Sequence, residues 1–241
     1  MNRIEQQPDS LISEPSTGAY AVELARYTCS DEQSAHALFA PLHYEPNYAY
    51  PLVVWLHGSE DNERQLKRIM PLVSMRNYVA VAPRGTASDH ADCSYRWQQT
   101  EEQIWQAEQR VFDCVERVQK KFNIHADRIF LAGLGCGGTM AFRIALNNPQ
   151  QFAGVLSLGG PFPTGLRPLQ RLDAARQLPL FLASGCESER YPMAAVCQDL
   201  RLFHSAGLSV SLRQYPCGDE LTTHMLADMD RWIMDRVCPG S

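Results

Sequence analysis

The feature that most constrains the fold is a glycine-rich stretch directly after a short apolar run. Residues Arg128–Gly138 have the sequence Arg-Ile-Phe-Leu-Ala-Gly-Leu-Gly-Cys-Gly-Gly. The run Ile129–Ala132 is typical of a buried strand, and Thr139–Leu146 after the glycines is a predicted helix. Because glycine reaches backbone conformations that other residues rarely adopt, the stretch predicts a strand, a very tight turn and a helix packed close to the strand.

Two kinds of strand–turn–helix unit carry such glycines. In the pattern G-x-S-x-G the turn presents a strained nucleophile at the top of a sheet. In the pattern G-x-G-x-x-G the backbone holds a pyrophosphate. Gly133, Gly135 and Gly138 fit the second spacing, whereas Gly133, Gly135 and Gly137 fit the first with glycine at the nucleophile position. The spacing alone leaves both interpretations open.

The dinucleotide interpretation requires an acidic residue about 20 residues further on, at the end of the next strand. Between Thr139 and Cys186 the only acidic residue is Asp173, which does not follow a predicted strand. The glycines also lie mid-chain, after three predicted strands, and not in the first strand–helix unit. The sequence therefore disfavours a dinucleotide site, and we expect no cofactor.

Composition limits the partners. The chain has 241 residues, of which 45% are apolar and 20% charged, as expected for one α/β domain with a sizeable core. Its net charge of −5 and the lack of a Lys/Arg cluster argue against a nucleic-acid partner. No apolar run is long enough to span a membrane, so a membrane partner is not expected either.

The N-terminus and the cysteines indicate where the protein resides. We expect residues 1–30 to form a flexible tail and residues 31–241 a single domain, because the N-terminus lacks the apolar core of a signal peptide. Without an export signal, the eight cysteines are predicted to be reduced thiols in the cytoplasm. None forms a C-x-x-C pair.

Strands and helices alternate along the chain. Strands are predicted over Ala35–Leu42, Leu52–His57, Tyr78–Pro83, Ile129–Ala132, Ala153–Leu158, Pro179–Ala183 and Leu208–Tyr215. Helices are predicted over Asn62–Ser74, Thr100–Phe122, Thr139–Leu146, Pro192–Ala206 and Thr222–Val237, with a short helical piece within Pro163–Gln177 and Thr100 as a helix N-cap. This alternation predicts a mostly parallel central sheet with helices on both faces.

From about Ala35 to Val237 the chain resembles the phospholipase/carboxylesterase and dienelactone-hydrolase-like group of the α/β-hydrolase superfamily. The segments that carry the resemblance are Pro51–Ser59 (strand and oxyanion loop), Arg128–Gly138 (nucleophile turn), Leu180–Pro192 (acid loop) and Tyr215–Trp232 (histidine loop and last helix). The resemblance implies an α/β-hydrolase fold. It also implies a crevice bordered by the oxyanion loop, with His57, Gly58, Ser59, Trp97 and Cys136.

The resemblance does not extend to the catalytic side chains. The nucleophile position is Gly135, the acid position is Ser188, and the position of the histidine is Asp219. A serine hydrolase needs a nucleophile, a base and an orienting acid, and all three are replaced. We therefore expect no catalytic residue, and a non-hydrolytic relative that binds a small ligand or a protein partner of unknown identity.

The alternative is a carboxylic-ester or thioester hydrolase that uses Cys136 or another nucleophile in the crevice. Cys136 follows the apex of the turn by one residue, so its side chain is predicted to point away from the line of attack and to fill space as a small apolar group. The remaining histidines His57, His90 and His224 do not match the position of the family's base. Ser59 and Ser184 are interpreted as ordinary loop serines.

Thiols and carboxylates gather after the predicted strands. Because open α/β sheets bind ligands beyond the carboxyl ends of their strands, these residues could line one pocket. The cysteines are Cys93, Cys136, Cys186 and Cys217, and the acids are Glu60, Asp61, Glu187, Glu189, Asp219 and Glu220. Loop residues commonly face solvent, and that interpretation stays open. The sharper hypothesis is a pocket for a cation or a soft metal with Cys186, Glu187, Cys217, Asp219 and Glu220, in which mutual repulsion raises carboxyl pKa values.

Overall fold

The computed structural model of this protein describes residues 35–87 and 95–238. The expected tail over residues 1–30 lies outside the described residues, as do His90 and Cys93. The described chain is built around a seven-stranded sheet with the order β1-β3-β2-β6-β7-β8-β9. All neighbouring strands are parallel except β1, which pairs antiparallel with β3. This confirms the predicted α/β architecture with a mostly parallel sheet.

The sheet strands are β1 (His36–Phe39), β2 (Tyr50–Leu56), β3 (Val79–Pro83), β6 (Ile124–Leu134), β7 (Gly154–Leu158), β8 (Leu180–Gly185) and β9 (Val210–Tyr215), and a separate small hairpin is formed by β4 (Thr86–Ala87) and β5 (Tyr95–Arg96). The helices are α2 (Gln65–Val73), α3 (Glu101–Lys121), α4 (Cys136–Asn147), the 3₁₀ turn η1 (Pro149–Gln151), α5 (Leu172–Ala175), α6 (Met193–Ala206) and α7 (Thr223–Val237).

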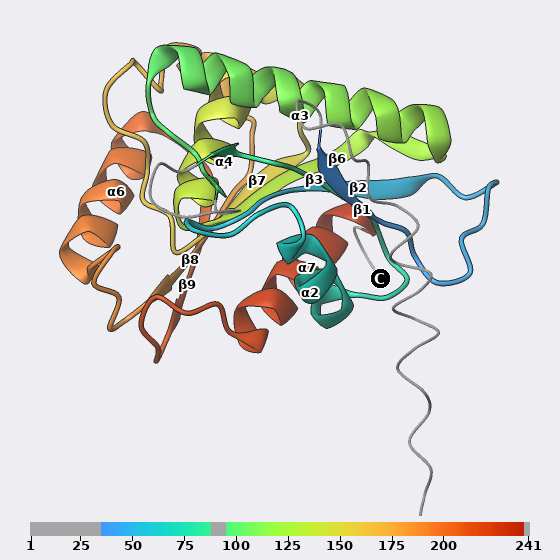
Figure 1. The fold of residues 1–241 in the computed structure, drawn as a ribbon. Helices are drawn as coiled ribbons and strands as arrows, with labels where there is room; N and C mark the ends of the chain where they lie inside the picture. The colour runs from blue at the N-terminus through green and yellow to red at the C-terminus, as the bar shows by residue number, and fades with distance from the viewer. Residues whose placement is uncertain (1–34, 88–94, 239–241) are drawn as a thin grey trace, which may run out of the picture.

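Helices cover both faces of the sheet (Figure 1). The buried strand β2 shows why: its side chains alternate between two hydrophobic clusters. Leu52, Val54 and Leu56 join the cluster that includes residues of α3, α4 and α6. Val53 and Trp55 join the cluster that includes residues of α2 and α7. Because both faces of this strand carry apolar side chains, helices must cover the sheet on both sides.

Close packing of α4 on the sheet depends on glycine. A Cβ atom at Gly137 would lie 2.2 Å from the carbonyl oxygen of Leu56 in β2. A Cβ atom at Gly138 would lie 2.3 Å from Oγ of Ser157 in β7. The first turn of α4 can therefore approach the strands only because these residues have no side chains.

Two element boundaries differ from the sequence prediction around the same turn. Helix α4 begins at Cys136 and not at Thr139, because Gly137 and Gly138 are helical and not part of the turn. Strand β6 begins at Ile124, five residues before the apolar run, because Ile124 pairs with Tyr50 across an irregularity in the register. The predicted N-cap of α3 is confirmed, since the Thr100 side chain accepts a hydrogen bond from the amide of Gln103.

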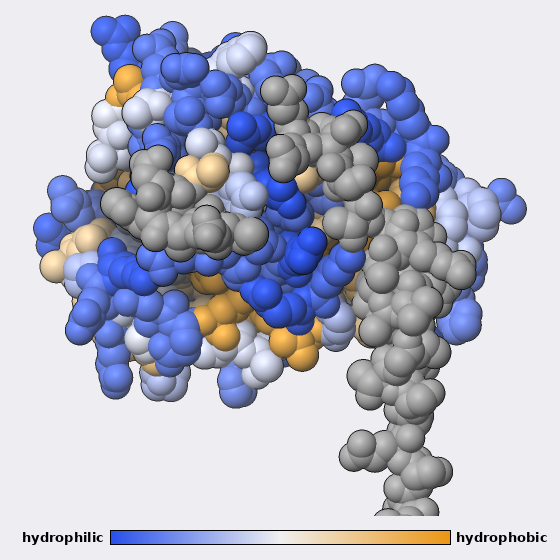
Figure 2. Space-filling model, in the orientation of Figure 1, coloured by the Kyte–Doolittle hydropathy of each residue, from blue (hydrophilic) through white to orange (hydrophobic). Residues whose placement is uncertain are grey.

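The outer surface is mainly hydrophilic on the face shown in Figure 2, with small separate hydrophobic areas. Large exposed apolar side chains in the described residues are scattered over several elements: Tyr48, Leu72, Trp105, Leu166, Met193 and Leu202. No helix within residues 35–87 and 95–238 has both the length and the apolarity that crossing a bilayer requires.

Candidate functional site

The turn between β6 and α4 holds Gly135 in a conformation that side-chain-bearing residues rarely adopt. Its backbone angles are φ 52° and ψ −118°. Its amide donates to the Leu158 carbonyl at 2.8 Å, and its carbonyl accepts from the Thr139 amide at 3.1 Å. A Cβ atom built on Gly135 would meet no other atom within 4 Å. The side-chain position of Gly135 thus faces open space.

Ser188 and Asp219, in the loops after β8 and β9, contact each other directly. Ser188 Oγ donates a hydrogen bond of 2.5 Å to Asp219 Oδ1. The amide of Tyr191 donates to Ser188 Oγ at 2.9 Å, and the amide of Arg190 donates to Asp219 Oδ1 at 3.2 Å. The two loops after β8 and β9 are therefore held together by a hydroxyl and a carboxylate.

The electrostatics of this pair keep Asp219 ionised. The hydrogen bond from Ser188 lowers the pKa of the Asp219 carboxyl below its usual value, and the backbone and charge of Arg190 act in the same direction. This corrects the expectation that repulsion among the loop acids raises the pKa of Asp219. The hydrogen bond from Ser188 and the contacts with Arg190 outweigh burial, which acts in the opposite direction on the Asp219 pKa.

His57, in the oxyanion loop, is fully buried and held on both ring nitrogens. The Gly85 amide donates to Nε2 at 3.0 Å, so Nδ1 carries the proton and donates to the Gly58 carbonyl at 2.8 Å. Burial lowers the pKa of the imidazole. Trp97 Nε1 donates to the His57 carbonyl at 3.0 Å. His57 and Trp97 therefore shape the loop, and the neutral ring has no nitrogen left for a substrate.

Gln65, the first residue of α2, contacts this loop and was not predicted as a site residue. Its Oε1 accepts from Trp55 Nε1 at 2.7 Å and from the Gly58 amide at 3.2 Å. Its Nε2 donates to Asp61 at 2.9 Å. A buried polar residue inside an apolar helix face was the available signal, because such a side chain must find partners.

Cys136 lies at the start of α4 and reaches the oxyanion loop. Ser59 Oγ donates to Cys136 Sγ at 3.3 Å, and the half-buried thiol packs against the cluster on the α3 and α4 side. Within the described residues Cys136 hydrogen-bonds to no histidine. The structure thus brings Ser59 and Cys136 together but supplies no base at the thiol.

Of the other predicted thiols and acids, Cys186, Glu187, Cys217 and Glu220 lie directly after β8 and β9. The Cys186 amide donates to the Tyr215 carbonyl at 2.8 Å, and the Glu187 amide donates to the Cys217 carbonyl at 3.0 Å. Burial raises the pKa of the Cys217 thiol, as do the charges of Glu220 and Glu187. Within the described residues, however, no three His, Cys, Asp or Glu side chains converge closely enough to hold a metal ion.

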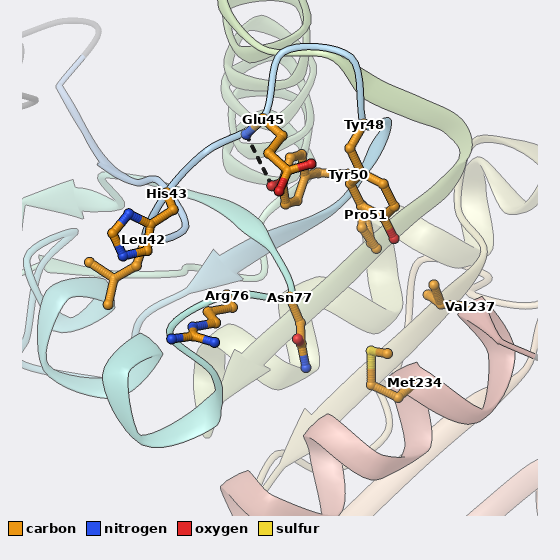
Figure 3. Close-up of a pocket in the computed structure, with 10 residues that line it drawn as sticks. All are labelled: Leu42, His43, Glu45, Tyr48, Tyr50, Pro51, Arg76, Asn77, Met234 and Val237. Carbon is orange, nitrogen blue, oxygen red and sulfur yellow. Dashed lines mark hydrogen bonds between the residues drawn. The ribbon is translucent and has the colours of Figure 1, made fainter. Parts of the chain in front are cut away.

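The other fallback residues lie apart from the turn. His224 is exposed in the first turn of α7. Ser184 is buried in β8, and its Oγ has no hydrogen-bond partner among the described residues. A cavity of about 390 Å³ lies where β2 and β3 begin, with Tyr50, Arg76 and Met234 among its lining residues (Figure 3). It is at the amino ends of the strands, opposite the end that carries Gly135.

Comparisons with known proteins agree with this geometry. The model of the phospholipase/carboxylesterase family matches residues 47–235. A probable carboxylesterase of Oryza sativa subsp. japonica is 22% identical over 214 residues, which cover 80% of this chain and 91% of the relative.

Solved structures show the same fold at low identity. Bacillus cereus carboxylesterase has a TM-score of 0.67 at 16% identity, covering 83% of this chain and 93% of that one. Arabidopsis thaliana SOBER1 has a TM-score of 0.66 at 17% identity, covering 78% and 100%. Zea mays acyl-protein thioesterase 2 has a TM-score of 0.66 at 14% identity, covering 84% and 98%.

Proposed function

Because this chain belongs to the phospholipase/carboxylesterase family of α/β-hydrolases, we propose that it keeps the crevice of an esterase but binds a small ligand or a protein partner there without hydrolysing it. The relatives named above are esterases and a thioesterase. The crevice of this chain lacks the side chains for that chemistry at Gly135, Ser188 and Asp219.

The observation that carries the proposal is the hydrogen bond between Ser188 and Asp219. In a serine hydrolase the base takes the proton of the nucleophile, and the acid accepts a hydrogen bond from the base. Here the residue at the base position is the carboxylate, and it accepts from a hydroxyl at the acid position. A carboxylate whose pKa is lowered by this contact is a poor proton acceptor. No side chain at Gly135 offers it a proton.

The groups around Gly135 have features that support binding. A Cβ atom on Gly135 would meet no other atom within 4 Å. The first amides of α4, from Cys136 onward, have no intrahelical acceptors, as at any helix start, so they can donate to a carbonyl or an anionic group of a ligand. Ser59 and Cys136, which contact each other at 3.3 Å, add a hydroxyl and a thiol. These groups suit a polar small molecule.

The proposal predicts no ester hydrolysis. With p-nitrophenyl butyrate as substrate, the rate should equal that of a heat-denatured sample, and a fluorophosphonate probe should leave the protein unlabelled. An active relative such as the Bacillus cereus carboxylesterase serves as the positive control. Turnover above the denatured sample, or stoichiometric labelling by the probe, would contradict the proposal.

The second candidate function is a carboxylic-ester or thioester hydrolase that uses Cys136, favoured by the contact of its thiol with Ser59 in the oxyanion loop. Protection of the Cys136 thiol from iodoacetamide and turnover of a thioester distinguish this candidate from the first. Turnover abolished by Cys136→Ala and unaffected by Cys197→Ala, which removes an exposed thiol on α6, would establish this mechanism and displace the first proposal.

We also propose a cytoplasmic location. Cys114, Cys136, Cys186, Cys197 and Cys217 are free thiols, as expected in a reducing compartment. Fractionation of the source cells with an antibody against the protein tests this, and recovery in an exported fraction would contradict it.

A further inference from the structure

A cavity of about 370 Å³ lies beside the β1 edge of the sheet, between the end of β3, the hairpin β4–β5 and the middle of α3. Its volume lies in the range of small-molecule sites. The polar side chains that line it are Arg84, Thr86, Tyr95, Arg110, Asp113 and Arg117. We call it the α3 cavity.

The α3 cavity is separate from the crevice, because Gly135, Ser188 and Asp219 do not line it. The α3 cavity and the loop that holds His57 adjoin at one residue. Gly85 lines the cavity, and its amide donates to the buried Nε2 of His57 in the oxyanion loop. The loop of the crevice therefore forms part of the structure behind the cavity wall.

The cavity has an excess of positive charge. Arg84 is compensated, since Nε and NH2 donate to the buried Glu63 carboxylate at 2.8 and 2.7 Å. Neither Arg110 nor Arg117 forms an ion pair with any carboxylate in the described part of the chain. Asp113 lies between them on α3 but joins neither.

Arg110 is the key group. It is half-buried, and its only described contacts are long ones, from NH1 to the Arg84 carbonyl and to Thr86 Oγ1, each 3.4 Å. Burial lowers the pKa of its guanidinium, with no carboxylate to oppose the effect. Since a partly desolvated cation is costly without a counter-charge, the environment of Arg110 favours an anion in the cavity.

The geometry points to the α3 cavity as a binding site for the oxyanion of a small molecule, a carboxylate or a phosphate, with Arg110 and Arg117 as the donors. Guanidinium groups bind such oxyanions through paired hydrogen bonds. Arg110 and Arg117 lie two turns apart on α3, and both line the cavity. A ligand whose oxyanion group contacts one of them can therefore reach the other with the rest of the molecule. Thr86 adds a hydroxyl donor, and the Tyr95 ring adds an apolar contact surface. The site does not depend on whether the crevice hydrolyses esters.

Calorimetric titration tests this with three probes at constant ionic strength, adjusted with chloride: inorganic phosphate, phenyl phosphate and benzoate. We expect saturable binding of at least one probe. Tighter binding of the phosphates than of benzoate identifies a phosphate ligand, and the reverse order identifies a carboxylate. Arg110→Gln should weaken binding about tenfold or more, as expected for loss of a charge-assisted pair.

Two further variants separate the site from general charge effects and from folding. Arg117→Gln changes an exposed residue of α3 and should weaken binding in the same direction without affecting the fold. Arg201→Gln removes the same charge from the exposed face of α6 and should leave the affinity unchanged. No saturable binding of any probe up to about 10 mM, or equal affinities in wild type and both α3 variants, would overturn the proposal.

Discussion

Gly135 shows how glycine relieves backbone strain in a tight turn. With φ 52° and ψ −118°, a residue with a side chain would be strained there. A nucleophilic serine holds that conformation at a cost of about 1–3 kcal/mol. Glycine adopts it without the penalty, and a Cβ atom built there would meet no other atom within 4 Å.

The first prediction concerns this strain. Gly135→Ser and Gly135→Ala should each lower the free energy of unfolding by about 1–3 kcal/mol. The two losses should match, because the added Cβ meets no neighbour and only the backbone is affected. Urea denaturation measures both. Neither variant should hydrolyse p-nitrophenyl esters, and unchanged stability in both would show that the turn is not strained.

The second prediction concerns Asp219. Because its folded-state pKa is lowered, the folded protein binds this proton less readily than the unfolded chain, whose aspartate has a pKa of about 3.9. The stabilisation is therefore present above pH ~4 and is lost as the pH falls further. Compared with Asp219→Asn, the wild type should be more stable at pH 7, and this difference should shrink below pH ~4.

Ser188 provides the control for that titration. Ser188→Ala removes the main cause of the lowered pKa, so the pH dependence contributed by Asp219 should become smaller in this variant. A stability difference between wild type and Asp219→Asn that is constant from pH 7 to pH 2.5 would refute the assignment.

At the scale of the element, α4 is fixed by how closely its first turn lies on β2. A third prediction follows from this contact. Alanine is favoured over glycine within a helix by about 1 kcal/mol, yet a Cβ at Gly137 would lie 2.2 Å from a backbone oxygen of β2. Backbone atoms cannot rotate away, so Gly137→Ala should be net destabilising by about 1–3 kcal/mol.

Urea denaturation checks the sign of that change. Thr100→Ala at the N-cap of α3 provides a reference, because the loss of the hydrogen bond to the Gln103 amide should cost about 1 kcal/mol. A stabilised Gly137→Ala variant would show that α4 can move away from β2.

The elements were predictable to different degrees, for physical reasons. Apolar runs such as Leu52–His57 gave the central strands, because burial on both faces leaves a clear pattern. The start of α4 was missed because Gly137 and Gly138 suit both a turn and a closely packed helix. The start of β6 was missed because residues 124–128 are mostly polar, and only pairing with β2 makes Ile124 part of the strand.

The assignment of Gly135, Ser188 and Asp219 to the family's catalytic positions comes from the sequence pattern and stays a prediction. Their contacts were not predictable from the sequence. The hydrogen bond between Ser188 and Asp219 reverses the expected pKa direction, and 31 residues of chain separate the two. The charge of the α3 cavity was likewise not predictable from the sequence. Only the fold pairs Arg84 with the distant Glu63, so that the positive charges of Arg110 and Arg117 are left in excess.

At the scale of the whole molecule, three tyrosine–aspartate hydrogen bonds tie helices to the segments beside them. Tyr78, directly before β3, and Tyr215 of β9 donate to Asp230 and Asp228 of α7 at 2.7 and 2.8 Å. Tyr191 donates to Asp199 of α6 at 2.6 Å. Burial raises the pKa of each phenol, and the partnering aspartate adds to the effect.

The last prediction follows from the sign of these shifts. An unfolded tyrosine has a pKa of about 10. A raised folded-state pKa therefore gives stability that is fully present below pH ~10 and is lost as the pH rises above it. Buried Cys114, whose pKa is raised to about 12, acts in the same direction from pH ~9 upward. His57, whose pKa is lowered, acts oppositely, so its contribution is lost as the pH falls below ~6.5. The free energy of unfolding should thus be highest between pH ~6.5 and pH ~9.

Replacing Tyr78, Tyr191 and Tyr215 by phenylalanine should lower stability at pH 8 and make its decline above pH 10 shallower, because the unfolded variant has fewer protons to lose. Tyr48→Phe, at an exposed ring, should leave the alkaline decline unchanged. A triple variant that declines as steeply as the wild type would show that these three bonds do not set the alkaline limit.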